Sequence, residues 1–391
     1  MKVAFVCQRY GMEIGGGAEL HCRWIAEHMS QHWEVEVLTS RAFDYISWKD
    51  HYPEGKQVVN GIPVRRFSVS KTRNPVKFGK IQEFILKNEH REEDELKWLE
   101  AEGPHVPSLI RYIEDNSQDY DYFVFFSYRY YHSYWGIHTV PQKSILVPTA
   151  EKDPVIRLKI FRELFLKPQA IVYNSEEERR MINALSRNEH IPGDVVGVGT
   201  EIPSGFSAQK FRQEYRIEGD YIIYIGRIDE NKGCHELFDF FLRYKRETRS
   251  SVKLILIGGT VLKIPSHPDI HYIGFVSDEM KFSALDGALL LVMPSFYESL
   301  SMVTLEAWAV EKPVLANGRC EVLRGQCVRS NAGLYYENYE EFEEALTLLL
   351  SSPKLREALG KDGRQYFQHR YTWEVIEKKY LALLERLERE R

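Results

Sequence analysis

The sequence predicts an α/β protein built from two doubly wound domains, and three observations support this fold class. The chain has 391 residues, which is more than a single hydrophobic core usually fills. Short apolar runs alternate with longer amphipathic segments along most of the chain, a pattern typical of βα units around parallel sheets. The alternation stops in the Pro- and Gly-containing stretch Ile191–Gly205 and restarts near Tyr221.

The first domain is expected to span residues 1–200. Its predicted strands are apolar at nearly every position, which indicates a sheet covered by helices on both faces. These strands are Val3–Cys7, Val35–Thr39, Val64–Phe67, Tyr122–Ser127, Ser144–Pro148, Ala170–Asn174 and a closing run at Val195–Val198.

The second domain is expected to span residues 201–372. Its predicted strands are Tyr221–Ile225, Lys253–Ile257, His271–Ile273, Leu289–Met293, Pro313–Ala316 and Gly333–Tyr336. The final segment, Trp373–Arg391, is charged on one side and apolar on the other, so it predicts an amphipathic helix. The apolar side carries Trp373, Ile376, Tyr380, Leu383, Leu384 and Leu387.

The composition, 43% hydrophobic and 28% charged, is that of an ordinary globular protein. A net charge of −5 argues against a dedicated nucleic-acid binder but does not exclude a small anionic ligand. No apolar run approaches the ~18 residues of a membrane span, and the N-terminus turns polar too early for a secretory signal. The five scattered cysteines predict neither disulfides nor a metal site. We therefore expect a cytoplasmic protein.

One segment, Lys71–Glu102, interrupts the alternation. It begins with basic residues and ends with acidic ones. A solvated helical excursion explains such a charge pattern. The functional alternative, which the pattern favours less, is a flap that grips an anionic or lipid-linked acceptor. Peripheral contact with the inner face of a membrane stays open.

The stretch Leu289–Ala307 holds two carboxylates where a ligand is expected. A strand ends at Pro294, a polar turn follows, and a helix is predicted to begin near Ser299. Ligands of open α/β sheets bind beyond the carboxyl ends of strands, and a helix N-terminus favours an anion. Glu298 in the turn and Glu306, about two turns into the helix, can then contact a sugar and a ribose. Alternatively, Glu298 only favours the helix dipole and Glu306 is partly solvated.

A second candidate site follows the first strand of the second domain. Gly226 allows close approach of the backbone to a ligand. Arg227 and Lys232 supply two cations suited to a diphosphate leaving group. The alternative is a tight turn whose charges face solvent.

A third candidate is the glycine run Gly15–Gly17, which lies between the first strand and the helix predicted from Ala18 to Met29. A glycine run at such a turn makes a cradle of amides for a phosphate or a close-packed sugar. It is not the dinucleotide fingerprint, because Leu20 stands where the third glycine belongs. The alternative is a flexible turn without a ligand.

In their order and separation, the pair Glu298 and Glu306, the cations Arg227 and Lys232, and the loop Gly15–Gly17 resemble the GT-B glycosyltransferases. More narrowly, they resemble the retaining family 4. The resemblance covers nearly the whole chain. It implies two Rossmann-like domains facing each other across a cleft, with the final helix crossing back to the first domain.

The resemblance also implies roles for individual residues. The second domain would hold a nucleotide sugar, and Glu298 would contact the transferred sugar as a catalytic group. The first domain would recognise the acceptor. Implied ligands of the donor phosphates are Arg227, Lys232, Ser299, Leu300, Gly16 and Gly17; those of the ribose and base are Glu306, Phe275 and Val276.

The activity implied is retaining transfer of a hexosyl group from a nucleoside-diphosphate sugar to a saccharide, lipid-linked or small-molecule acceptor. Such enzymes need no bound metal and no cofactor besides the donor substrate. Two alternatives stay open: a sugar-nucleotide epimerase on the same fold, and a non-catalytic subunit that binds a nucleotide sugar. The sequence does not name the base, the sugar or the acceptor.

The chain departs from the family after the strand Ser144–Pro148. Many relatives carry a His there, whereas this chain has Glu151. A carboxylate could stabilise a developing oxocarbenium ion or act as a nucleophile. Alternatively, Glu151 only pairs with Lys152 or Arg157.

Aromatic residues follow the strand Tyr122–Ser127 at the edge where the acceptor is expected. Aromatic rings stack well on sugars, and core packing explains the same residues equally. The acceptor candidates are Tyr128, Tyr131 and His132.

Overall fold

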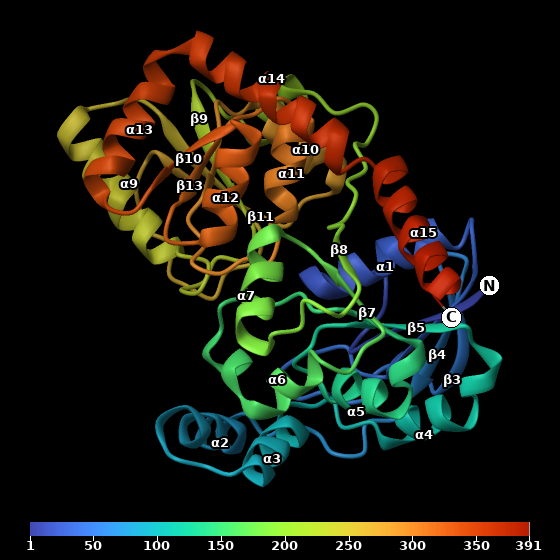
Figure 1. Ribbon diagram of the computed structural model, residues 1–391. Coiled ribbons are helices and arrows are strands. Elements are labelled where there is room, and N and C mark those ends of the chain that lie inside the picture. The colour runs from blue at the N-terminus through green and yellow to red at the C-terminus, as the bar shows by residue number, and fades with distance from the viewer. Residues whose placement is uncertain (391) are drawn as a thin grey trace. The chain divides into compact units, whose positions relative to one another are not determined.

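The structure is a computed structural model that describes residues 1–390, and the chain divides into two compact units. Unit 1 comprises Met1–Val198 and Glu377–Arg391, and unit 2 comprises Gly199–Ile376. Each unit is a sheet with helices packed against its faces (Figure 1).

The sheet of unit 1 has the strand order β3-β4-β2-β1-β5-β6-β7-β8. All neighbours pair in parallel except β3 and β4, which form an antiparallel hairpin. The strand order reverses between β1 and β5, which makes that point the topological switch of the sheet. The strands are β1 Lys2–Cys7, β2 Glu34–Ser40, β3 Gly55–Val59, β4 Ile62–Phe67, β5 Tyr122–Phe126, β6 Ser144–Val147, β7 Ala170–Tyr173 and β8 Gly193–Val195.

The structure differs from the predicted strands at two places. The closing strand is β8, which ends at Val195, where the predicted run begins. The hairpin strand β3 was not predicted, because its residues alternate between half-buried and exposed at the sheet edge. The turn between β3 and β4 is Asn60-Gly61, both with positive φ, a sequence that favours tight hairpins.

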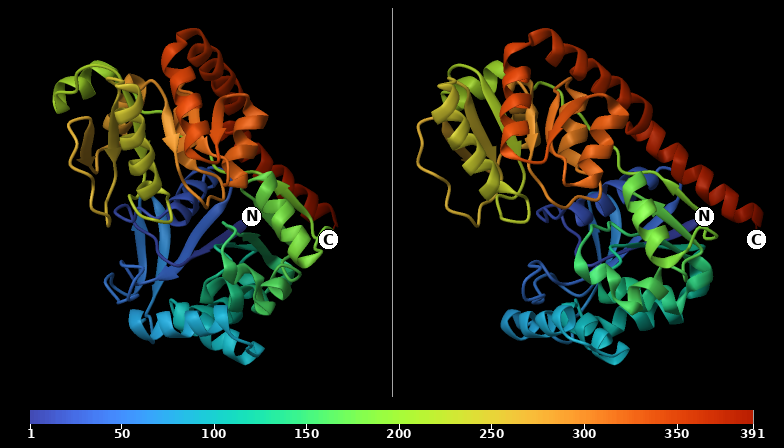
Figure 2. Two further views of the ribbon diagram at one scale, coloured as in Figure 1. Left: turned by 90° about the vertical axis from the view of Figure 1, so that its left-hand side faces the viewer. Right: turned by 60° about the vertical axis from the view of Figure 1, so that its left-hand side comes forward.

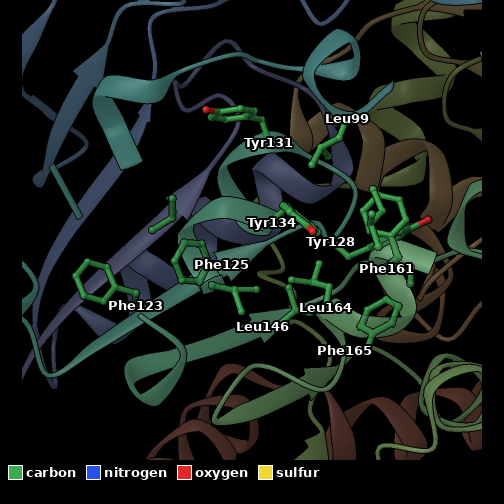
Figure 3. Close-up of a cluster of buried hydrophobic side chains, with 14 of the residues drawn as sticks. Leu99, Phe123, Phe125, Tyr128, Tyr131, Tyr134, Leu146, Phe161, Leu164 and Phe165 are labelled. Atoms are coloured by element: carbon green, nitrogen blue, oxygen red, sulfur yellow. The ribbon is translucent and has the colours of Figure 1, made fainter. Parts of the chain in front are cut away.

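The core of unit 1 lies between the central strands and the helices that cover them (Figure 3). Every residue of β5 and β6 is buried. Rings from β5 and from the helices α5 and α6 fill this core. The helices are α1 Gly17–Met29, α2 Pro75–Lys87, α3 Glu92–Glu102, α4 Pro107–Asp115, α5 Tyr131–Thr139, α6 Lys159–Leu164 and α7 Glu176–Ser186.

The segment Lys71–Glu102 forms the helix pair α2 and α3, which packs together at one side of unit 1 (Figure 2). α3 also contacts α6. The outer face of α2 is exposed and includes Val76 (72% exposed) and Phe84 (44% exposed). The expected helical excursion is therefore present, and it carries apolar as well as basic residues outward.

The sheet of unit 2 is parallel throughout and has the order β11-β10-β9-β12-β13-β14. Counted along the unit this is the order 3-2-1-4-5-6 of the Rossmann fold, and it reverses between β9 and β12. The strands are β9 Tyr221–Ile225, β10 Lys253–Ile257, β11 Ile270–Gly274, β12 Leu291–Met293, β13 Val314–Asn317 and β14 Gly333–Tyr336. The helices are α8 Ala208–Tyr215, α9 Cys234–Thr248, α10 Asp278–Gly287, α11 Met302–Ala309, α12 Glu321–Ser330, α13 Tyr339–Ser351 and α14 Pro353–Arg370.

The last helix, α15 (Trp373–Glu390), begins in unit 2 and belongs to unit 1 from Glu377 onward. The Glu377 carboxylate contacts His28 Nδ1 at 2.9 Å and His32 Nε2 at 3.0 Å. Tyr122 donates a hydrogen bond to Glu388 at 2.7 Å. These contacts confirm that the final helix packs against unit 1. None of the helices within residues 1–390 combines the length and apolar character needed to cross a bilayer.

Candidate functional site

The strongest candidate site lies at the switch point of the unit 2 sheet, where the loops after β9 and β12 meet. Gly233 in the first loop has φ 68°, and a Cβ there would lie 2.1 Å from the carbonyl oxygen of Pro294 in the second. Only glycine allows this approach. The close contact brings the cations of one loop beside the carboxylate of the other.

Asp229 organises the two predicted cations of the first loop. It is 7% exposed and accepts a hydrogen bond from Arg227 Nε. Its other carboxylate oxygen accepts from the backbone N–H of Lys232 at 2.8 Å. Asp229 was not among the predicted site residues, although its position between the two cations was a usable signal.

Lys232 and Glu298 form an ion pair across the two loops. Lys232 Nζ lies 2.8 Å from Glu298 Oε1 and 3.4 Å from the Tyr297 carbonyl oxygen. The side chains are 26% and 11% exposed. The predicted phosphate cation and the predicted sugar contact are therefore neighbours.

The helix after the second loop begins later than predicted. α11 starts at Met302 rather than near Ser299, because Ser301 adopts φ 68° and ψ 84° and interrupts the helical path. Its hydroxyl lies 2.9 Å from that of Thr304. Ser299 and Leu300 consequently lie in the turn before the helix, and Glu306 stands just over one turn into it rather than two.

Glu306 is 3% exposed, so the alternative that it is partly solvated is wrong. Its Oε1 accepts a hydrogen bond from Lys281 Nζ of α10 at 2.7 Å, while burial raises the pKa of the Glu306 carboxyl. Within residues 1–390, Oε2 has no hydrogen-bond partner. Buried polar oxygens are normally paired, so Oε2 is available to ligand hydroxyls.

The remaining donor-site candidates follow β11. Phe275 is 85% exposed and Val276 is half-buried. An exposed ring at the carboxyl edge of the sheet is suited to stack on a base. Their predicted role beside a base stays a prediction.

The glycine loop of unit 1 adjoins a carboxylate. Gly16 precedes α1, and a Cβ at Gly16 would lie 2.1 Å from Glu19 Oε2. Glu19 is 7% exposed and forms a bidentate contact with Arg9, at 2.8 Å from Nε and 2.5 Å from Nη2. Gly16 thus makes room for an ion pair, and Gly17 is the first residue of α1. The predicted role of the glycine run, a cradle for a phosphate or a close-packed sugar, stays a prediction.

A cavity of about 210 Å³ lies at the carboxyl ends of β1, β5 and β6. We call it the unit 1 pocket; Gln8, Glu19, Ser127, Thr149, Glu151 and Asp153 are among its lining residues. Glu151, the residue that departs from the family pattern, therefore faces a cavity at the switch point of its sheet.

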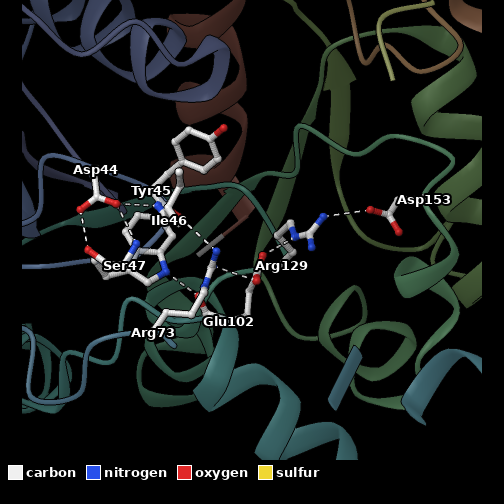
Figure 4. A network of polar contacts seen from close by, with 9 residues as sticks. Asp44, Tyr45, Ile46, Ser47, Arg73, Glu102, Arg129 and Asp153 are labelled. Carbon is white, nitrogen blue, oxygen red and sulfur yellow. Dashed lines mark hydrogen bonds and ion pairs between the residues drawn. The ribbon is translucent and has the colours of Figure 1, made fainter. Parts of the chain in front are cut away.

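Ion pairs fix one wall of the unit 1 pocket (Figure 4). Arg129 contacts Asp153 at 2.9 Å through Nη1 and Glu102 at 2.9 Å through Nε. Glu102 is 5% exposed in its side chain and also contacts Arg73 Nη2 at 2.9 Å. Arg73, expected in a solvated or gripping flap, instead anchors the end of α3.

Two of the three acceptor candidates belong to the core. His132 is 0% exposed, its Nε2 lies 3.1 Å from the Phe126 carbonyl oxygen, and burial lowers its pKa to about 4. Tyr131 is 8% exposed. Tyr128 lines the unit 1 pocket, yet its ring packs edge-on against Phe161. For Tyr131 and His132 the packing alternative therefore holds, because neighbouring side chains already cover their rings.

Residues 207–366 match the family model described as Glycosyl transferases group 1, and this segment contains both cations and both carboxylates of the unit 2 site. Over the full chain, sucrose-phosphate synthase from Thermosynechococcus elongatus superposes with a TM-score of 0.74 at 15% identity, covering 100% of each chain. The resemblance to the GT-B glycosyltransferases is confirmed.

Two further matches agree with this GT-B assignment. HepE of Anabaena, solved in complex with UDP, has a TM-score of 0.70 at 15% identity over 98% of this chain and 100% of its own. The capsular polysaccharide biosynthesis glycosyltransferase CapM of Staphylococcus aureus is 26% identical over 220 residues, which cover 50% of this chain and 56% of CapM. The curated relatives are matched over 42% to 62% of their own lengths.

A further buried residue, Glu178, was not predicted from the sequence. It holds the loop that carries Glu151. Glu178 of α7 is 1% exposed and accepts hydrogen bonds of 2.5 Å from the backbone N–H groups of Ala150 and Asn174. Burial raises its pKa to about 8. The signal was the pattern Ser175-x-x-Glu178, which resembles a capping box. Here the glutamate reaches the loop that carries Glu151.

Proposed function

We propose that the chain is a retaining glycosyltransferase of the family 4 type, which moves a hexosyl group from a nucleoside-diphosphate sugar to an acceptor hydroxyl without a metal ion. The observation that carries this proposal is the Lys232–Glu298 pair, with Nζ 2.8 Å from Oε1. It lies at the switch point of a Rossmann-type sheet, within the segment that matches group 1 glycosyl transferases. Unit 2 is the donor unit of this proposal.

The charges of unit 2 suit the bond that must break. As the bond between the anomeric carbon and the β-phosphate oxygen lengthens, negative charge develops on the phosphate. Lys232 and Arg227 stabilise this charge, and the turn amides of Ser299 and Leu300 add neutral donors. Glu298 then accepts hydrogen bonds from the transferred sugar, and Glu306 Oε2 accepts from the ribose.

Retention follows if the acceptor attacks the face that the phosphate leaves. The acceptor oxygen forms the new bond to the anomeric carbon, and its proton passes to the departing phosphate oxygen. Glu151 stabilises the positive charge on the sugar in this scheme. The alternative role of Glu151, as a nucleophile, requires a covalent glycosyl-enzyme intermediate.

The testing experiment is nucleotide release from UDP-, GDP- and ADP-sugars without acceptor. UDP-glucose comes first, because the structural neighbour HepE was also solved with UDP-glucose. Loss of release in Glu151→Ala, with donor affinity kept, would give Glu151 a chemical role. The matched control is Glu163→Ala, an exposed glutamate on α6. Covalent labelling of Glu151 by a 2-fluoro donor would favour the nucleophile.

The two alternatives give different results in the same experiment. An epimerase changes the configuration of the donor sugar and transfers no sugar to an acceptor. A binding subunit holds the donor with no turnover on any acceptor. Turnover in which the anomeric configuration inverts would reject the retaining mechanism.

For a lipid-linked acceptor, we propose that α2 contacts an anionic membrane surface. Val76, Lys77, Lys80 and Phe84 recur at helical spacing on its exposed face. A face that combines lysines with apolar side chains is suited to lipid headgroups.

A further inference from the structure

The unit 1 pocket is placed where an α/β sheet binds ligands. Gln8 follows β1 and Ser127 follows β5, the two strands between which the strand order reverses. Its volume of about 210 Å³ is below the roughly 300–1,000 Å³ of pockets for drug-sized ligands. The pocket is therefore of a size for one small ring.

Gln8 lines this pocket and carries an unsatisfied polar atom. The residue is 2% exposed, and its Oε1 has no hydrogen-bond partner within residues 1–390. Its backbone is held, because the Gln8 carbonyl oxygen accepts from Ser40 Oγ at 2.5 Å. Leaving a buried acceptor unpaired is unfavourable. A ligand hydroxyl that donates a hydrogen bond to Oε1 would relieve this penalty.

Two strained residues line the pocket beside Gln8. Ser127 has φ 68° and Thr149 has φ 48°, conformations that non-glycine residues rarely adopt and that a β-branched Thr adopts at a cost. Their hydroxyl oxygens lie 2.7 Å apart. This geometry holds a pair of hydroxyl groups at the ends of β5 and β6, in the same cavity that Gln8 lines.

The charges of the pocket disfavour an anionic ligand. Among the described residues that line it, three carboxylates (Glu19, Glu151, Asp153) stand against one guanidinium, that of Arg129. Arg9, outside the lining, pairs with Glu19, and Arg129 pairs with Glu102 and Asp153, so both guanidiniums are already engaged. A phosphate placed here would meet an excess of negative charge, whereas neutral hydroxyls can bond to the same carboxylates, to Gln8 and to the hydroxyl pair.

We propose that the unit 1 pocket binds an uncharged sugar ring of the acceptor, oriented by Gln8, and rejects a phosphorylated ring in the same place. The inference rests on the proposed transferase function and specifies its acceptor class. It makes Gln8 a specificity-determining residue.

The test is ligand-detected NMR titration of the full chain without nucleotide. The probes are methyl α-glucoside, methyl α-mannoside and methyl α-galactoside, each beside its 6-phosphate. We expect at least one neutral glycoside to bind at least about tenfold more tightly than its phosphate, as charge repulsion across a few ångströms predicts. Equal or tighter binding of the phosphates, or no binding of any neutral glycoside at millimolar concentration, overturns the proposal.

Two variants locate the binding. Gln8→Leu keeps the volume and removes the acceptor atom, so affinity for the neutral ring should fall about five- to tenfold. Gln169→Leu is the control. Gln169 Oε1 is likewise buried and unpaired within residues 1–390, but Gln169 lies at the amino end of β7, away from the carboxyl ends that form the pocket. Equal effects of the two substitutions would overturn the assignment to Gln8. Melting temperatures show whether each variant is folded.

A third variant tests the charge. Asp153→Asn can still accept from the Val155 N–H at the start of the 3-10 turn Pro154–Arg157, but removes a negative charge. In this variant the ratio of affinities for the neutral glycoside and its phosphate should fall several-fold. Asp119→Asn, at an exposed site near the other end of β5, should leave this ratio unchanged.

A UDP-glucose titration separates the two proposals. Neutral sugar binding with no nucleotide binding rejects the transferase and keeps the pocket; the reverse rejects the pocket alone.

Discussion

Lys232 Nζ lies 2.8 Å from Glu298 Oε1, so two loops that are 66 residues apart in the chain share one ion pair. In the proposed reaction each partner serves a different part of the donor. Lys232→Ala should lower turnover about 10²-fold, because it removes a charge that stabilises the leaving phosphate. Glu298→Ala should lower it comparably through the transferred sugar.

The matched control for these variants is Lys210→Ala, which breaks the surface pair of Lys210 with Glu279 in the same unit. Initial rates of nucleotide release with saturating acceptor give the comparison. Wild-type rates in a folded Lys232→Ala or Glu298→Ala variant would contradict the site.

Glu306 should distinguish a ribose from a deoxyribose. If Oε2 accepts from a ribose hydroxyl, wild-type affinity for 2′-deoxy- or 3′-deoxy-UDP should be about tenfold below that for UDP. In Glu306→Leu, which has no acceptor atom, UDP and the deoxy analogue should bind alike. Isothermal titration calorimetry measures the affinity of each protein for both ligands. A deoxy penalty that persists in Glu306→Leu would place the ribose elsewhere.

Glu178 predicts a loss of stability as pH rises. Its folded-state pKa of about 8 lies above the ordinary value of 4.5. The folded protein therefore keeps a proton that the unfolded chain releases. This contribution is complete below pH 4.5 and is lost as pH rises through 8, on the order of 5 kcal/mol. Relative to Glu178→Gln, the wild type should lose stability over this range in urea denaturation. If the stabilities of the wild type and of Glu178→Gln change in parallel with pH, the prediction is refuted.

His132 predicts the opposite slope in acid. Burial lowers its folded pKa to about 4, below the ordinary value of 6.5. The stability of the neutral ring is present above pH 6.5 and is lost as pH falls through 4, on the order of 3 kcal/mol. His132→Asn should flatten the acid limb of the denaturation profile.

Transfer activity at pH 7.5 should survive in folded Tyr131→Phe, since Tyr131 is a core residue.

The exposed face of α2 predicts membrane binding that depends on charge. With vesicles of 30% phosphatidylglycerol, the wild type should sediment in the pellet and the Lys77→Glu, Lys80→Glu double variant should stay in the supernatant. The reason is that each lysine contributes about 1 kcal/mol near an anionic surface. Vesicles of phosphatidylcholine alone are the lipid control. A Lys361→Glu variant, at an exposed site in unit 2, is the protein control. Retention of the double variant would reject the α2 contact.

Much of the fold was predictable because its signals are local. Strands such as Tyr221–Ile225 and Lys253–Ile257 are continuous apolar runs, and the structure places β9 and β10 at those residues. The edge strand β3 escaped prediction because half of its side chains face solvent. Only the Asn60-Gly61 turn marked it.

The candidate site was predictable as a set of residue types but not as a set of contacts. Lys281 and Glu306 are 25 residues apart on different helices, and no spacing rule joins them. The left-handed backbone at Ser301 moves the start of α11, and serine gives no warning of it. Glu19 beside Gly16 could not be foreseen either, since a buried partner, Arg9, holds it there.

In the linear sequence, unit 2 is an insertion between Val198 and Glu377 of unit 1. If unit 2 binds the donor as proposed, residues 199–376 can be exchanged as one segment to change donor specificity while both ends of unit 1 stay in place. Joining a foreign C-terminal half at residue 198 alone would discard Tyr380, Leu383, Leu384 and Leu387, which are each 1% exposed. A working chimera needs two crossovers, and the second belongs inside α15.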